Sequence, residues 1–109
     1  MKIIKLMPDY QCFPIWDMTP GEYGDIDPAA LPISNLLQRQ LMGWAKAYDE
    51  TLNLDDPANS GFSSVNEKNA FEAEGFRLAA QLSVELGSQF EVQEKIRAFT
   101  RREESEFKR

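Results

Sequence analysis

A single apolar stripe between Ile33 and Leu52 constrains the fold of this chain more than any other feature. Large apolar residues recur there at steps of four, three, four and four, the spacing of one face of an α-helix. They are Leu37, Leu41, Trp44, Tyr48 and Leu52. Pro32 stops the helix from extending backwards, and Asn35 is expected to cap its start, with Gln38 completing a weak capping box. Because burying one such side chain is worth roughly 1.5–3 kcal/mol, the rest of the chain must cover this stripe.

A capping box at residues 64–67, Ser-Val-Asn-Glu, predicts that a second helix begins at Val65. Its apolar positions follow the same steps as the first helix once Gly75 is included. They are Phe71, Leu78, Leu82 and Leu86. A glycine inside a helix costs about 1 kcal/mol relative to alanine, so we predict a close helix crossing at Gly75, under Trp44. Gly87 is a natural C-terminal stop.

Two short apolar runs are expected to form strands. Residues 2–7 are rich in β-branched side chains, and residues 89–92 alternate between apolar and polar. We expect the second strand to lie beside the first. The order strand, loop, helix, helix, strand predicts one α+β domain over residues 1–109, with two main antiparallel helices packed on one face of a small two-stranded sheet.

The last segment, residues 93–109, is expected to form a third helix, packed by Ile96 and Phe99, or a frayed extension. From Glu94 onwards it carries six basic and four acidic residues. Its basic side chains could contact RNA, but the interspersed glutamates favour a solvated helix face that carries charges of both signs.

Composition narrows the functional classes. A hydrophobic content of 42% over 109 residues is typical of one folded domain. The absence of histidine removes the commonest general base and zinc ligand, so we expect neither an enzyme nor a cofactor or metal. The net charge of −6 argues against binding to nucleic acid. A single cysteine and the lack of any apolar run near the ~20 residues of a membrane helix indicate a cytoplasmic protein, expected to be monomeric when free.

The segment from Pro8 to Pro32 is the least regular part of the sequence. It holds five of the six prolines and no lasting helical or strand period, so we predict a long irregular loop, pinned to the core by its aromatic side chains. Between Leu6 and Gln38 there is no Lys or Arg but there are five acidic residues. These are Asp9, Asp17, Glu22, Asp25 and Asp27.

Acidic side chains beside Trp16 and Tyr23 match a binding face for a basic partner, because aromatic rings anchor an interface while carboxylates steer and pair with Arg. In the alternative interpretation, Trp16 and Tyr10 only plug the core, and the acids only keep the loop solvated. Both interpretations stand on sequence alone. The candidate partner-binding residues are Trp16, Asp17, Glu22, Tyr23, Asp25, Asp27, Asp55 and Asp56.

Three other candidate sites carry less weight. Counted from Asp56, Gly61 and Glu67 fall at positions six and twelve of a calcium-binding loop, but two expected ligand positions hold Ala58 and Ser60, which favours a plain turn. The carboxylate pairs at residues 25–27 and 55–56 suit a two-carboxylate enzyme or a magnesium site, although such pairs are more often solvated turn residues or helix caps. Cys12 lacks a basic neighbour and is expected to be a buried structural thiol.

Several segments also resemble a family of small bacterial proteins that includes immunity proteins of contact-dependent growth inhibition and related polymorphic-toxin systems. The segments are MKIIKLMPDYQCFPIWD, DIDPAALPIS, residues 44–53, DDPANSGF and residues 71–79. The resemblance covers about residues 1–92, and the tail after Val92 departs from the shorter ending of that family. It implies a protein that binds a toxin domain and blocks its active site. Many such toxins are nucleases with basic clefts, so it also implies that the acidic loop acts as a crude phosphate mimic.

The leading hypothesis is therefore a cytoplasmic immunity protein that covers a basic nuclease toxin with its acidic loop. The alternative is a small adaptor or regulatory protein whose loop is only structural, and a weaker third option is a histidine-free enzyme that uses the paired carboxylates. A toxin gene ending immediately upstream would favour immunity, whereas a metabolic operon would favour the other two.

Overall fold

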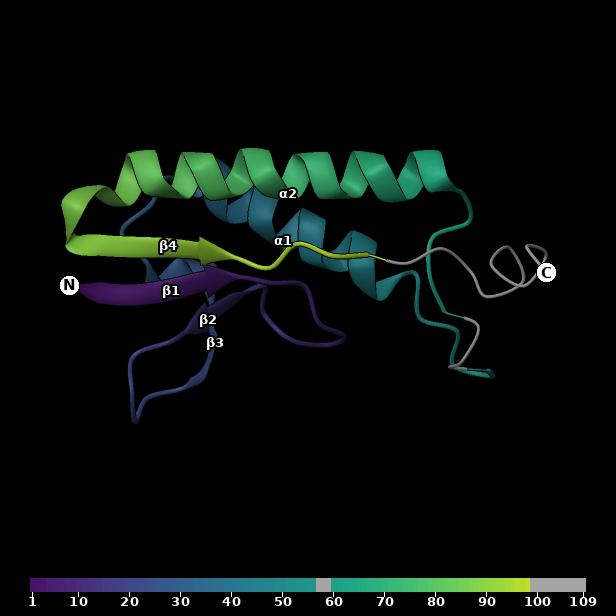
Figure 1. Ribbon diagram of the computed structural model, residues 1–109, viewed down its shortest axis with the longest axis horizontal. Coiled ribbons are helices and arrows are strands. Elements are labelled where there is room, and N and C mark those ends of the chain that lie inside the picture. Colours follow the sequence, from purple (N-terminus) through teal and green to yellow (C-terminus); the bar gives the residue numbers. More distant parts are fainter. Residues whose placement is uncertain (57–59, 99–109) are drawn as a thin grey trace.

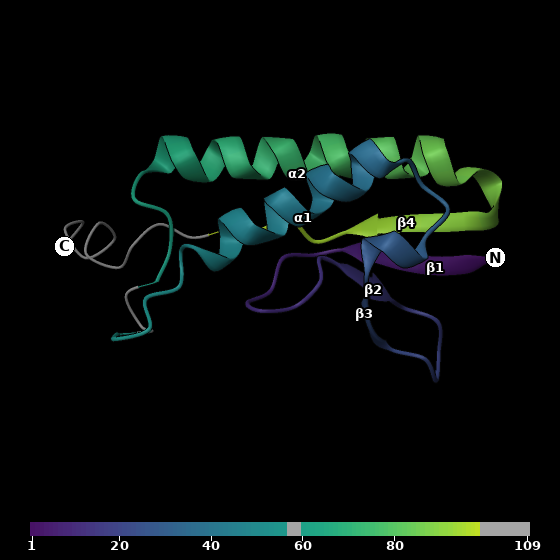
Figure 2. The same cartoon turned by 180° about the vertical axis from the view of Figure 1, so that it is seen from behind.

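Two helices cover one face of a four-stranded sheet in the computed structural model, which describes residues 1–56 and 60–98 (Figures 1 and 2). The strands are β1 (Lys2–Leu6), β2 (Ile15–Asp17), β3 (Gly24–Ile26) and β4 (Phe90–Glu94). The helices are α1 (Asn35–Asp49) and α2 (Val65–Leu86), and short 3-10 turns form η1 (Pro28–Ala30) and η3 (Gly87–Gln89). The α+β class and the antiparallel pair of helices are confirmed.

The sheet has the order β3-β2-β1-β4, so the predicted number of strands is wrong. β1 pairs antiparallel with β2, which pairs antiparallel with β3, while β4 lies parallel to β1. Ile4 of β1 stands opposite Asp17 of β2 and Val92 of β4. The predicted neighbour relation between the first and last strands is thus confirmed. The two helices supply the crossover connection that the parallel pair requires.

The irregular loop predicted for residues 8–32 is also corrected, because it contains β2, β3 and η1. Each of these two strands is only three residues long, which is too short for an alternating pattern to stand out among prolines and glycines. They are strands because β2 pairs with β1 and β3 pairs with β2: Leu6 stands opposite Ile15, which in turn stands opposite Ile26.

The N-cap of helix α1 lies one residue before the expected one, so the helix itself begins at Asn35. Ser34, not Asn35, is the N-cap, and its hydroxyl accepts a hydrogen bond from the Leu37 backbone N–H at 3.1 Å. The helix ends at Asp49, so Leu52 lies beyond it. The predicted stripe is otherwise buried as expected, with Leu37, Leu41 and Trp44 in the core and Tyr48 partly buried.

Helix α2 confirms the prediction at both ends. The Ser64 hydroxyl accepts from the Glu67 backbone N–H at 3.1 Å, and Gly87 caps the C-terminus with a φ of 70°. The predicted contact between Gly75 and Trp44 is confirmed as well: a Cβ at position 75 would lie 2.6 Å from Trp44 Cζ2. The missing side chain therefore lets the indole of α1 lie directly against α2.

The chain after β4 corrects the predicted third helix as far as it is described. Residues 95–98 have no helical structure, and the Ala98 backbone N–H donates to the Glu72 carboxylate at 3.0 Å. Ile96 is buried, and its Cγ2 would lie 2.9 Å from a Cβ at Gly75. Residues 99–109, with Phe99, lie outside the described residues.

The core lies between the sheet and the helix pair. Its fully buried side chains come from both layers, and they include Ile4, Leu6, Ile15, Leu37, Leu41, Leu78 and Leu82. Within residues 1–56 and 60–98, no helix has both the length and the apolar content that a membrane crossing requires.

Candidate functional site

Asp17 differs from the other acidic candidates because its carboxylate is paired inside the protein. It stands opposite Ile4 on the inner face of the sheet and is only 8% exposed. Its carboxylate lies 2.9 Å from the Lys2 ammonium and accepts from the Thr19 backbone N–H at 2.9 Å. The hydrogen bond from Lys2, followed by that from Thr19, lowers the pKa of Asp17. Lys2 thus supplies a positive charge to the segment between Leu6 and Gln38, which contains no Lys or Arg.

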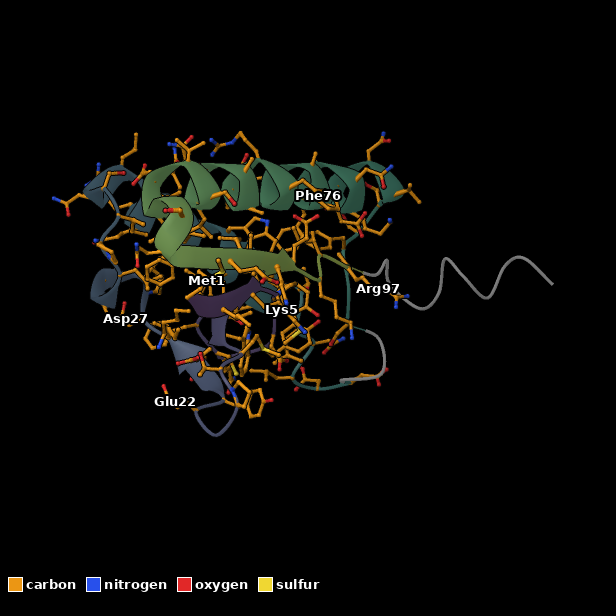
Figure 3. The ribbon with its side chains drawn as sticks, turned by 60° about the vertical axis from the view of Figure 1, so that its left-hand side comes forward. Met1, Lys5, Glu22, Asp27, Phe76 and Arg97 are labelled. Atoms are coloured by element: carbon orange, nitrogen blue, oxygen red, sulfur yellow. The ribbon has the colours of Figure 1, made fainter. Side chains whose placement is uncertain are left out.

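Glu22 and Tyr23 lie in the turn between β2 and β3 and face solvent. The Glu22 side chain is 63% exposed, and its nearest cation, the Lys2 ammonium, is 3.8 Å away. The Tyr23 side chain is 66% exposed. Figure 3 shows Glu22 at the opposite side of the molecule from Phe76 on α2. An incoming partner therefore has access to both residues.

Asp25 and Asp27 are exposed, but each also supports the local backbone. Asp25 accepts from the Phe13 backbone N–H at 2.9 Å, which ties the β1–β2 connection to β3. Asp27 accepts from the Ala29 backbone N–H at 2.9 Å and so caps η1. A carboxylate that accepts one backbone hydrogen bond keeps further lone pairs, so both groups can still pair with a cation.

Trp16 does not plug the core between sheet and helices. It stands opposite Lys5 in the sheet, one residue out of phase with the buried Ile15, which places it on the face that the helices leave uncovered. Its indole N–H donates to the Met7 carbonyl at 3.0 Å, and the side chain is partly buried. The ring therefore presents an apolar edge on the outer face of the sheet.

A second stretch without basic residues, residues 47–67, was missed by the sequence analysis, although the same count of charges would have found it. It contains Asp49, Glu50, Asp55, Asp56 and Glu67. Asp55 and Asp56 are exposed in the connection between α1 and α2, where their backbone N–H groups donate to the Asn53 side chain. Among residues 1–56 and 60–98, neither carboxylate has a hydrogen bond or ion pair.

The two stretches without basic residues meet at the C-terminal end of α1. The Tyr10 ring stacks on Tyr48 with 4.6 Å between centroids, and its hydroxyl lies 3.1 Å from the Thr51 hydroxyl. The Gln11 backbone N–H donates to the Asp49 carboxylate at 2.8 Å. Burial, reinforced by Tyr10 and nearby carboxylates, raises the pKa of Tyr48 to about 12, so this hydroxyl stays neutral.

Figures 1 and 2 show that three connections extend from the side of the molecule away from α2. They are the β1–β2 connection, the β2–β3 turn and the loop between α1 and α2, which carry Asp9, Glu22 and the pair Asp55 and Asp56 respectively. The negative C-terminal end of the α1 dipole adds to their charge. The structure therefore places these exposed acidic residues on one side.

Nothing in the described part of the chain supports metal binding or thiol chemistry. No three His, Cys, Asp or Glu side chains within residues 1–56 and 60–98 are grouped to hold a metal. Cys12 is partly exposed rather than buried, which corrects the expectation for this residue. Desolvation, together with Asp9, Asp25 and Asp49, raises the pKa of its thiol, so the nucleophilic thiolate is disfavoured.

Comparison with known proteins confirms the resemblance found in the sequence. No curated protein matches the chain at a significant level. The family described as Serratia CdiI immunity protein-like matches residues 2–94, which span all the helices and strands described above. The chain belongs to this family of contact-dependent growth inhibition immunity proteins.

Proposed function

We propose that this protein binds and neutralises a cognate toxin domain, a nuclease, by covering its basic active-site cleft. The match of residues 2–94 to an immunity family carries the proposal that it inhibits a toxin. The nuclease target is inferred from charge: a cleft that binds phosphates is basic, and this chain has a net charge of −6. The encounter takes place in the cytoplasm, between the toxin and one copy of this chain.

The proposed contact surface is formed by the partly buried Trp16 and the exposed members of the candidate set, namely Glu22, Tyr23, Asp25, Asp27, Asp55 and Asp56. Its support is the arrangement of exposed carboxylates on loops that extend from the side opposite α2. Asp17 is left out of direct contact because its carboxylate is buried against Lys2, and its role is to hold β2 beside the N-terminus.

Co-expression tests the inhibitory function directly. Cells that make the toxin domain encoded immediately upstream of this gene should survive only when this protein is also made. Death of the cells despite abundant folded protein would remove the immunity role, and an upstream metabolic gene would favour an adaptor.

Association kinetics test the acidic surface. The double variant Asp25→Asn with Asp27→Asn keeps a side-chain oxygen for the Phe13 and Ala29 N–H groups but removes two charges. It should slow association with an inactivated toxin domain by roughly tenfold or more at low salt, on the scale of electrostatic steering. The control Glu91→Gln removes an exposed charge from β4, at the sheet edge opposite β3, and should leave the rate nearly unchanged. Equal rates for the double variant and the wild type would place the interface elsewhere.

A further inference from the structure

An apolar groove of about 520 Å³ opens between the C-terminal half of α1 and the N-terminal half of α2. Trp44 and Phe71, stacked with 4.5 Å between ring centroids, form its floor, and Phe62 packs against Phe71. Small residues line its sides, including Gly43 on α1 and Ala70 on α2. This volume is large enough for side chains of another molecule.

Gly43 has no explanation within the described part of the protein. It lies inside α1, where a glycine costs about 1 kcal/mol relative to alanine. A Cβ there would meet nothing within 4 Å, in contrast to Gly75, where a Cβ would collide with Trp44. Its φ is not in the left-handed region, so the backbone does not require glycine either. Among residues 1–56 and 60–98 nothing fills the space at position 43, which leaves α1 open to the close approach of another group.

The polar groups around the groove select the chemistry of that occupant. Glu67 and Glu74 stand at its rim, and none of the described lining residues is Lys or Arg. An adjoining depression of about 250 Å³ shares Phe62 and Glu67 with the groove and adds Glu50. Glu74 is already paired with Arg77 at 2.6 Å, which leaves Glu50 and Glu67 as the acceptors of a further cation.

We propose that this groove receives a segment of the cognate toxin in which an apolar side chain lies over Trp44 and Phe71 and a neighbouring Arg or Lys pairs with Glu67 or Glu50. The proposal rests on the immunity function proposed above and names the anchor of that interface. A second copy of this chain fits poorly, because it would bring the same carboxylates against each other in a symmetric contact. The groove also borders the loop that carries Asp55 and Asp56, so anchor and acidic surface are continuous.

Filling the groove tests the anchor. Gly43→Leu should weaken binding to the inactivated upstream-encoded toxin domain, raising its Kd by roughly tenfold or more, as expected for blocking a buried anchor. Because a Cβ at position 43 meets nothing within 4 Å and leucine favours a helix more than glycine does, the melting temperature should not fall below that of the wild type. Two controls should bind within about threefold of the wild type: Gly43→Ala, which adds one methyl group, and Ala80→Leu, which enlarges an exposed residue of α2 outside the groove.

Neutralising the rim tests the chemistry of the occupant. Glu67→Gln keeps an oxygen for the Ser63 hydroxyl but removes the charge, so it should weaken binding and flatten its salt dependence. Wild-type affinity in Gly43→Leu would overturn the groove as the anchor while leaving the immunity function intact. If Gly43→Leu weakens binding but the salt dependence stays unchanged when Glu50→Gln is combined with Glu67→Gln, the occupant is not basic and that part of the proposal is overturned. No binding or protection by the wild-type chain would overturn both proposals together.

Discussion

At the scale of single residues, the two helical glycines illustrate opposite uses of a missing side chain. Gly75 makes room for Trp44 and Ile96 within the fold, whereas Gly43 faces open space. Alanine at position 75 therefore measures the cost of packing inside the fold, whereas alanine at position 43 measures the gain in helix propensity alone.

Gly75→Ala should destabilise the protein by about 1–2 kcal/mol, because the cost of overpacking against Trp44 and Ile96 exceeds the gain in helix propensity. Gly43→Ala is the matched control and should stabilise it by about 0.5–1 kcal/mol. Urea unfolding of both variants measures the two changes in the free energy of unfolding. Equal stability of the two variants would contradict the close contact at Gly75.

The ion pair between Lys2 and Asp17 predicts how stability depends on pH. The folded pKa of Asp17 is lowered and that of Lys2 is raised, chiefly by the hydrogen bond that joins them. The stabilisation is therefore present between about pH 4 and about pH 10, is lost as the pH falls through the folded pKa of Asp17, and is lost as the pH rises through that of Lys2.

Asp17→Asn should lower the melting temperature clearly at neutral pH and much less in acid, at a pH below the lowered pKa of the folded Asp17 carboxylate, where the wild-type side chain is itself protonated. Glu22→Gln is the control, because its carboxylate is 3.8 Å from Lys2 and exposed, and it should change little at either pH. If Asp17→Asn lowers the melting temperature equally at both pH values, then packing and not charge makes this residue important.

At the scale of the elements, Ser34 joins the start of α1 to the end of α2. Its hydroxyl accepts from the Leu37 N–H, while its own N–H and hydroxyl donate to Glu85 at 2.6 and 3.0 Å. The hydrogen bond from the Ser34 backbone, followed by that from Gln81, lowers the pKa of Glu85. This link fixes where the two helices lie relative to each other at one end, and the contact between Gly75 and Trp44 fixes them near the middle of α2.

Ser34→Ala should cost about 1–2 kcal/mol of stability, because it removes the helix cap together with one hydrogen bond to Glu85. Ser83→Ala, an exposed change in α2, serves as its control and should be neutral or slightly stabilising. Thermal and urea unfolding measure both changes. A neutral Ser34→Ala would mean that a neighbouring residue replaces the cap.

At the scale of the whole molecule, the acidic charge is unevenly distributed. The two stretches without Lys or Arg, residues 6–38 and 47–67, are brought together by the contacts of Tyr10 and Gln11 with the end of α1. Helix α2 instead carries charges of both signs, since Lys68 and Arg77 accompany its acidic residues, and its exposed surface includes the apolar Phe76 and Val84. Electrostatic steering should therefore bring a basic partner to the loops rather than to the back of α2.

The double variant Asp55→Asn with Asp56→Asn should leave the melting temperature unchanged, since neither carboxylate has a partner within the described residues. The same variant should slow association with the inactivated toxin domain at low salt. Added salt should remove the difference, because the Debye length falls to about 3 Å at 1 M. Stopped-flow measurements at two salt concentrations distinguish this from a loss of direct contacts, which would persist at high salt.

The sequence alone determined the features that depend on local spacing. The stripe of α1, the Ser64 cap and Gly87 of α2, and the small residue beneath Trp44 could all be predicted because a helix repeats over many residues and its ends have specific chemistry. The family resemblance was also evident from the sequence.

The features that join residues distant in sequence depend on how the folded chain packs. β2 and β3 are too short to show a period, and they become strands only because β2 pairs with β1 and β3 pairs with β2. Asp17 looked like its acidic neighbours until the fold placed it beside Lys2. The groove at Gly43 likewise exists only because two helices separated by a long loop pack together, since a cavity depends on which side chains meet and not on their order along the chain.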